Sequence, residues 1–314
     1  MGRYLLRRLA FLVLTILVTS LIVFGITQLL PGDVARVILG REAGEQALQE
    51  LRRELGLNAP LHIQYFRWLT DFFTGDWGQS FSTRQPIFEV VMQRLRNSAM
   101  LTGIILVLSV PTAIILGVLS GLNEGSFIDN VISIGALSVV GLPEFVTGLI
   151  LIEIFAFQLR LLPANSTIAL QAGFLEALPM LILPAVTATL VLLAYLARLT
   201  RAGVIEELDL SYVRTAVLKG LAWRQVTFKH VLRNALMPTI TVVAISFGWM
   251  MSGLIVIENV FNYPGLGRLM VFAIDRRDLP MLQAVTMVTV VSYTLANLLA
   301  DLLYAALDPK IELD

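Results

Sequence analysis

Six long apolar segments dominate this chain of 314 residues. Each is about as long as the 20 or so residues that an α-helix needs to cross the roughly 30 Å hydrocarbon core of a bilayer. Because lipid gives the backbone no water to hydrogen-bond, segments of this kind must be helical. Membrane-spanning helices are therefore expected at residues 9–30, 99–122, 131–157, 178–200, 236–258 and 283–307.

The composition also indicates an all-α membrane protein. Hydrophobic residues make up 57% of the chain and charged residues only 15%, whereas an ordinary soluble domain is about 25% charged. The chain has no cysteine, which excludes disulfides, thiolate catalysis and cysteine-based metal sites. The only two histidines are His62 and His230. The topology predicted below puts them on opposite sides of the membrane, so they cannot share a metal.

Positive charges near the helix ends predict the orientation in the membrane. Residues 1–30 form a basic tail and an apolar run that is too long for a signal peptide and lacks a small-x-small cleavage site, so we expect an uncleaved first helix. The tail and the basic loop at 201–235 should both be cytoplasmic. Six spans satisfy this requirement and place the end of the chain, residues 308–314, in the cytoplasm as well. The loop at 122–130 contains no Lys or Arg and does not bear on the orientation.

Residues 31–98 are predicted to form an external helical insert. Leu48, Leu51 and Leu55 lie on one face of a helix that ends at Gly56. Two interpretations of the insert remain open. It is either a helical cap on the outer membrane surface, with aromatic side chains at headgroup level, or a docking surface for an external protein. A second apolar stripe follows Pro60, at Leu61, Tyr65, Trp68, Leu69 and Phe72.

Motifs for hydrolysis of nucleotides or peptides are absent from the sequence. There is no GxxxxGK[ST] phosphate loop, and no HExxH, GxSxG or GxGxxG motif. We therefore expect no enzymatic activity, no catalytic residues, and no metal or cofactor bound by this chain. If its work requires ATP, another chain must hydrolyse it.

The basic loop at 201–235 is predicted to form two short amphipathic helices separated by a turn at Gly220. Apolar residues recur at helical spacing in both halves, with Arg and Lys between them. One interpretation is a helix pair that lies on anionic lipid. The other is a docking element for a protein outside the membrane.

This loop resembles the EAA loop of ABC-transporter permeases. The similarity covers Thr215 to Gly220 and Leu236-Met237-Pro238, although Arg214-Thr215-Ala216 stands where the general pattern has Glu-Ala-Ala. Other segments resemble the dipeptide and oligopeptide branch of that family, so the resemblance extends over nearly the whole chain. These segments are Leu30–Asp33, Gly75–Phe81, Glu258–Arg268 and Leu307–Lys310.

The resemblance implies the architecture of a type I ABC importer permease, with a five-helix core at residues 99–307. In that family the loop forms a coupling helix that sits in a groove of the ATP-binding subunit. The resemblance also implies partners: a second homologous permease, two subunits that bind ATP and Mg, and an external solute-binding protein. The residues that match the coupling helix here are Tyr212, Arg214, Thr215, Ala216, Lys219 and Gly220.

A charge and a helix breaker within the apolar segments indicate a route for solute. Pro143 and Glu144 lie near the middle of the third segment, where a carboxylate must face the protein interior or a watery cavity. They are candidates for the translocation path, with Met250 and Met251 as an adaptable lining. The alternative is a structural role, in which the carboxyl group stabilises helix contacts and the methionines pack between helices.

The sequence also predicts one ion pair and one set of contacts with an external protein. Asp301 in the last segment is expected to pair with Arg198 or Arg201. Residues in the external segments of the resemblance are candidate contacts with the solute-binding protein. These are Asp76, Trp77, Tyr263 and Pro264.

The expected function is import of di- or oligopeptides across a bacterial or archaeal inner membrane by alternating access. Nickel, glutathione or another peptide-like solute is an alternative within the same architecture. An ATP-independent carrier or channel would need several buried acidic or His residues, and only Glu144 is well placed. A membrane anchor or receptor would not explain the long basic loop. We expect contacts with lipid and none with nucleic acid.

Overall fold

The fold is helical throughout the part of the chain that the structure describes. One isolated bridge between Gln79 and Pro86 is the exception, and the predicted all-α fold is confirmed. The predicted cytoplasmic tail, residues 308–314, lies outside the described residues, as does most of 30–42. The computed structural model describes residues 2–29, 36, 39, 43–54, 56, 58–167, 173–252 and 254–307.

Among the described residues, four helices are long and apolar enough to cross a membrane without a break. Two further spans are bent, because α6 (Phe127–Val140) turns by 100° into residues Glu144–Gln158, and Trp223–Ala235 turns by 44° into α12 (Met237–Met251). Counting each bent pair as one span gives the predicted six. The four unbroken helices are α1 (Gly2–Leu29), α5 (Ile87–Leu122), α8 (Phe174–Leu208) and α15 (Leu279–Leu307).

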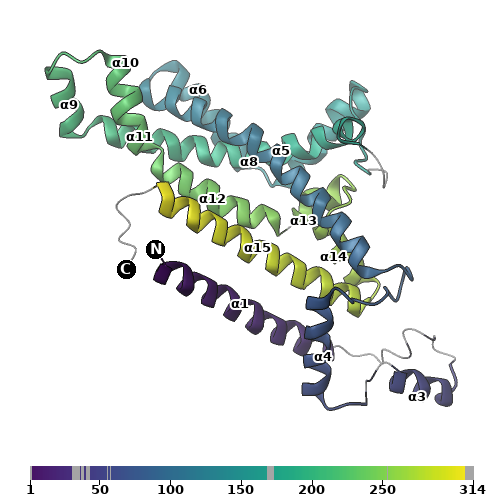
Figure 1. Cartoon of the computed structure of the whole chain (residues 1–314). Coiled ribbons are helices and arrows are strands. Elements are labelled where there is room, and N and C mark those ends of the chain that lie inside the picture. The colour runs from purple at the N-terminus through teal and green to yellow at the C-terminus, as the bar shows by residue number, and fades with distance from the viewer. Residues whose placement is uncertain are drawn as a thin grey trace.

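The spans run back and forth along a common direction (Figure 1). The basic loop lies at the end of the bundle where α1 begins, and it contains α9 (Ser211–Leu218), α10 (Trp223–Gln225) and α11 (Leu232–Ala235). The opposite end carries α13 (Ile255–Val260) and α14 (Leu266–Asp275), together with the two helices of the insert. The insert helices are α3 (Glu45–Glu54) and α4 (Leu61–Thr74).

α1 and α15 lie side by side in opposite directions (Figure 1). Arg8, near the start of α1, pairs with Asp301, near the end of α15, at 2.5 Å. The prediction that Asp301 pairs with Arg198 or Arg201 is therefore wrong, because the end of α15 lies beside the start of α1. The pair holds the first span against the last.

The second span begins earlier than predicted. α5 starts at Ile87, directly after Pro86, where the missing backbone N–H of proline breaks no helical hydrogen bond. Ile87 and Val91 are completely buried in a cluster that includes Leu266 of α14 and Met281 of α15. Residues 87–98 are therefore part of the bundle, and the external insert is shorter than the predicted 31–98.

The third and fifth spans are not single helices. α7 (Glu144–Ile152) begins directly after Pro143, which has no N–H to continue the helical ladder. Pro143 and Glu144 thus lie at a helix break, and their predicted place near the middle of one helix is wrong. The predicted helix at 236–258 is also wrong in its last residues, because α12 ends at Met251 and α13 starts at Ile255.

Close contact between α5 and α8 forms the centre of the bundle. A Cβ atom on Gly117 would lie 2.5 Å from Thr200 Cβ and 2.6 Å from the backbone oxygen of Ala197. One turn later, a Cβ atom on Gly121 would lie 2.8 Å from Val204 Cβ. Two glycines four residues apart let helix backbones approach closely in a membrane, where van der Waals packing drives association.

We expect Gly117→Ala to destabilise the protein by about 1–3 kcal/mol, because overpacking forces the backbone of α8 to move. Thermal unfolding in detergent measures this as a lower midpoint. Gly103→Ala on the same helix is the matched control, since a Cβ atom there meets nothing within 4 Å. It should be neutral or slightly stabilising, because alanine favours a helix over glycine. Equal midpoints for the two variants would contradict close packing at Gly117.

Candidate functional site

The basic loop folds onto the end of α8 as a small structural unit. Six of its side chains and neighbours form a hydrophobic cluster that is separate from the main core of the bundle. Packed side chains therefore connect α9 to α8. The members of this cluster are Val204, Val213, Ala216, Val226, Val231 and Ala235.

Two close approaches hold the loop in this position. A Cβ atom on Gly203 of α8 would lie 2.6 Å from the backbone oxygen of Ala235, so α11 rests directly on α8. At the far end, Gly220 has φ 79° and its N–H donates to the oxygen of Val217 at 2.9 Å. A positive φ favours glycine. The predicted turn between two helical pieces is thus present.

Tyr212 fixes the start of α9. Its hydroxyl donates to the Glu207 carboxylate at the end of α8 and accepts from Asn234 Nδ2 of α11 at 3.4 Å. Burial, reinforced by the bond to Glu207, raises the pKa of Tyr212, so the phenol stays protonated and keeps its role as a donor. Tyr212 therefore positions the loop and is itself only partly exposed.

The predicted coupling residues divide into two groups by exposure. Ala216 is 8% exposed and faces its own chain, so it supports α9 and does not offer its side chain to a partner. Arg214, Thr215, Lys219 and Gly220 are exposed. Apolar side chains missed in the prediction accompany them on the outer surface of the loop. These are Val217, Leu218, Trp223 and Phe228, and Leu218 is 81% exposed.

A buried ion pair connects α6 to α8 close to this loop. Arg201 donates twice to Asp129, from Nε to Oδ1 at 2.6 Å and from the guanidinium to Oδ2 at 2.8 Å. Asp129 also accepts from the Ser120 hydroxyl and from the N–H of Gly125 at 2.9 Å. Its side chain is only 3% exposed. The loop between α5 and α6, which carries no Lys or Arg, is thus tied to α8 by a positive charge that α8 supplies.

Arg201→Ala should lower stability by about 3 kcal/mol, because it leaves the buried Asp129 charge unpaired. Arg198→Ala is the matched control. Arg198 is an exposed arginine of α8 that makes no hydrogen bond or ion pair within the described part of the chain. Its loss should change the free energy of unfolding by about 0.5 kcal/mol or less. Chemical unfolding in detergent compares the two, and equal effects would contradict the role of the pair.

The predicted path residues are not all in one place. Pro143 is exposed and Glu144 is half-buried at the first turn of α7, at the break that follows α6. Met250 is 1% exposed and belongs to the main hydrophobic core, and Met251 is half-buried. In this conformation Met250 packs between helices and does not line a path. Glu144, at the break, is the one predicted path residue with a carboxyl group.

A buried carboxylate of α13 organises the segment that follows α12. Glu258 is fully buried and accepts from the Ser98 hydroxyl at 2.7 Å and from the N–H of Arg268 at 2.9 Å. A Cβ atom on Gly265 would lie 2.1 Å from a Glu258 oxygen, so the loop can close around the carboxylate only at glycine. This residue was missed as a separate feature, although it lies in a segment that carries the family resemblance.

Two of the predicted external contacts are consequently inaccessible. Tyr263 and Pro264 are buried in the loop around Glu258. The Tyr263 hydroxyl donates to the oxygen of Asn97, and Asn97 Nδ2 donates to the oxygen of Pro264 at 2.8 Å. Their prediction as contacts for an external protein is wrong for this conformation, because both residues hold the loop against α5.

A second buried acid, Asp278, closes the same end of the bundle. It accepts from the hydroxyl groups of Ser80 at 2.5 Å and Ser82 at 2.8 Å, and from the N–H of Ser82 at 3.1 Å. These bonds join the loop before α5 to the start of α15, 198 residues away in the chain. No periodicity or motif in the sequence could have indicated the pairing.

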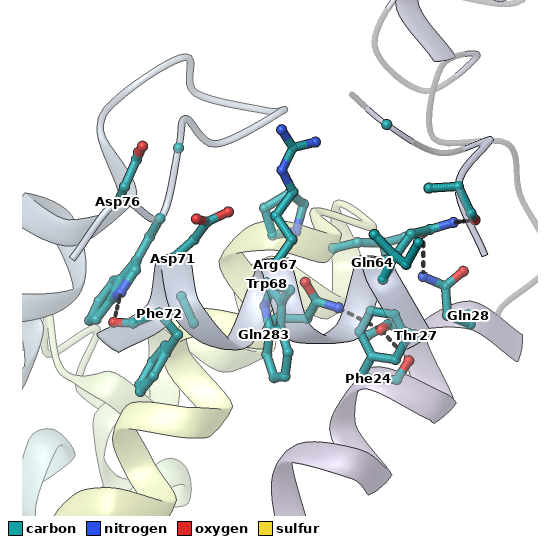
Figure 2. Close-up of a pocket in the computed structure, with 18 of the residues that line it drawn as sticks. Phe24, Thr27, Gln28, Gln64, Arg67, Trp68, Asp71, Phe72, Asp76 and Gln283 are labelled. Atoms are coloured by element: carbon teal, nitrogen blue, oxygen red, sulfur yellow. Dashed lines mark hydrogen bonds between the residues drawn. The ribbon is translucent and has the colours of Figure 1, made fainter. Parts of the chain in front are cut away.

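A pocket with a volume of about 710 Å³ lies beside α4 at this end. Figure 2 shows Arg67 and Asp71 on one side of α4 and Phe72 on the other. Asp76 is exposed at the rim, whereas Trp77 is half-buried, stacks on Phe72 and donates from Nε1 to its backbone oxygen. Of the four predicted external contacts, Asp76 and Trp77 are the two that remain accessible.

Within the described residues, no three His, Asp or Glu side chains are grouped as metal ligands. The structure presents three other features that are candidates for function. They are a folded loop with an exposed apolar patch at one end, a broken span with a carboxyl group in the bundle, and a capped pocket at the other end. This combination is that of a multi-pass membrane protein with a folded loop at one end of its helical bundle.

Comparison with known proteins identifies the family. Residues 113–313 match the binding-protein-dependent transport system inner membrane component, and residues 1–102 match its N-terminal part. A probable peptide ABC transporter permease of Sinorhizobium fredii is 39% identical over 311 residues, 99% of each chain. Glutathione transport system permeases of Salmonella paratyphi A and Escherichia coli K12 are 36% and 35% identical over the same length. The chain belongs to this family and is a non-catalytic permease subunit of an ABC importer.

Proposed function

We propose that this subunit imports di- and oligopeptides, or a closely related solute such as glutathione. The relatives named for peptide and for glutathione transport support this solute class, since each matches almost the whole chain. Nickel or another peptide-like solute is the alternative within the same architecture. Membership of an ABC importer family removes the ATP-independent carrier and the membrane anchor from consideration.

The proposed assembly contains a second homologous permease, two subunits that bind ATP and Mg, and an external solute-binding protein. It sits in the inner membrane with both termini and the basic loop in the cytoplasm. The shared location of the loop and the start of α1 at one end of the bundle supports this orientation (Figure 1). The positive charges of both segments support it as well.

The observation that carries the mechanism is the packed connection from α9 to the spans. An ATP-binding partner that binds the exposed residues of α9 would move α8 through the hydrophobic cluster that contains Val213 and Val226. The same displacement reaches α6 through the Arg201–Asp129 pair. A partner that contacts α9 differently with and without ATP can therefore switch the spans between inward- and outward-facing arrangements.

In this proposal the break between α6 and α7 lies on the solute path. The position of Glu144 supports this placement, because its half-buried carboxyl group lies at the break. A carboxylate in a membrane-spanning region is costly unless it faces water or a partner. The ammonium group of a peptide is a suitable partner for it during passage.

Cross-linking tests the coupling step. The chain contains no cysteine, so single cysteines can be introduced without background. In the assembled transporter, Leu218→Cys should cross-link to the ATP-binding subunit, because that side chain is 81% exposed. Ala216→Cys, two residues earlier, is the control and should cross-link poorly because it is buried. Efficient cross-linking from position 216 with none from 218 would count against this docking face.

Transport in reconstituted vesicles tests the path. Glu144→Gln should lower uptake of peptides with a free ammonium group by about tenfold, equivalent to 1.4 kcal/mol of lost interaction. Uptake of peptides with a blocked N-terminus should be unchanged. Glu153→Gln, at an exposed acid just beyond α7, is the control. Equal uptake of both peptide classes by wild type and Glu144→Gln would remove Glu144 from the path.

A further inference from the structure

α4 carries three distinct stripes of side chains. One is buried against α1 and the neighbouring loop, and Tyr65 and Trp68 belong to it. A polar stripe, made of Gln64, Arg67 and Asp71, lines the pocket beside the helix (Figure 2). The third stripe is apolar yet uncovered. It consists of Phe66 and Phe73, which are 63% and 65% exposed, whereas Ile63 lines the pocket with the polar stripe.

The depth of α4 relative to α1 shows what surrounds the uncovered stripe. The Tyr65 hydroxyl hydrogen-bonds Ser20 at 2.7 Å, and the Phe24 ring packs edge-on against Tyr65. Ser20 lies nine residues, or about 13.5 Å along the axis, before the end of α1 at Leu29. α4 therefore packs beside the last turns of α1, a helix long and apolar enough to cross a membrane, and does not lie beyond the end of that helix.

The orientation of α4 agrees with this depth. Figure 1 shows that α4 crosses the far ends of α1 and α15 instead of running parallel to them. The uncovered stripe contains no charged side chain. His62 lies near its N-terminal end, and the exposed Thr70 between the two phenylalanines donates its hydroxyl to the backbone oxygen of Phe66. Apolar side chains of α1, such as Leu21 and Ile22, are similarly exposed, at 54% and 52%. A helix with one apolar side and one polar side lies in the plane of a membrane interface.

We propose that α4 is an interfacial membrane helix. Phe66 and Phe73 are embedded among the acyl chains of the leaflet at that end of the bundle, which is the outer leaflet in the proposed topology. Gln64, Arg67 and Asp71 face water in the pocket. The helix separates lipid from this aqueous pocket and anchors the insert at a fixed depth. The proposal does not depend on the identity of the solute.

Single-cysteine labelling of the complete transporter in proteoliposomes tests this assignment, since the natural chain has no cysteine. An anionic thiol reagent should react with cysteines at 66 and 73 about tenfold more slowly than with one at 67. A barrier of 1.4 kcal/mol produces this factor, and moving a charge into hydrocarbon costs more.

A slow reaction would also result if a partner protein covered these side chains. Nitroxide labels at the same positions distinguish the two cases, because oxygen concentrates in lipid and collides more often with labels that face lipid. Labels at 66 and 73 should match one at Leu21 on the exposed side of α1 and exceed one at the buried Ala113. Reaction as fast as at Arg67 would place the stripe in water and overturn the proposal. Collision rates as low as at Ala113 would show that a partner subunit covers the stripe, and would also overturn it.

Discussion

The close pairing of α5 and α8 is the contact on which the rest of the structure depends. In hydrocarbon no hydrophobic effect draws helices together, so association relies on near approach of backbones and on polar bonds between them. Gly117 and Gly121 permit that approach. α6 is attached to this pair through Asp129 and Arg201, and the loop with α9 rests on the same helix at Gly203. Packed contacts therefore connect α9 to the centre of the bundle.

Three buried acidic side chains form hydrogen bonds that connect segments distant in the chain. Asp129 joins α6 to α8, Glu258 gathers the loop after α13 onto α5, and Asp278 binds the loop before α5 to α15. Each carboxylate is surrounded by donors, because a buried charge without partners costs far more than the bonds contribute when present. Glu258 and Asp278 stiffen the end of the bundle opposite the basic loop, where α4 and its pocket are found.

The sequence predicted the spans and the two helical pieces of the loop well, because both depend on local patterns. A run of apolar residues of membrane length has few alternatives to a helix, and Gly220 ends α9 through its own backbone freedom. The failures share a cause. The start of α5 at Ile87, the burial of Tyr263 and the pairing of Asp301 with Arg8 all depend on partners supplied by remote parts of the chain. Hydrophobicity averaged over a window cannot register such partners.

By itself the sequence determined that this chain is a helical membrane protein without catalytic machinery, and that a basic loop interrupts its spans. These properties follow from the free-energy cost of placing unpaired backbone groups and charged side chains in lipid. That cost depends on the local composition of each segment. Only the tertiary structure decided which face of α9 is available to a partner and which side of α4 is left uncovered. Those outcomes depend on which surfaces other helices bury, and burial is a property of the assembled bundle and not of any single segment.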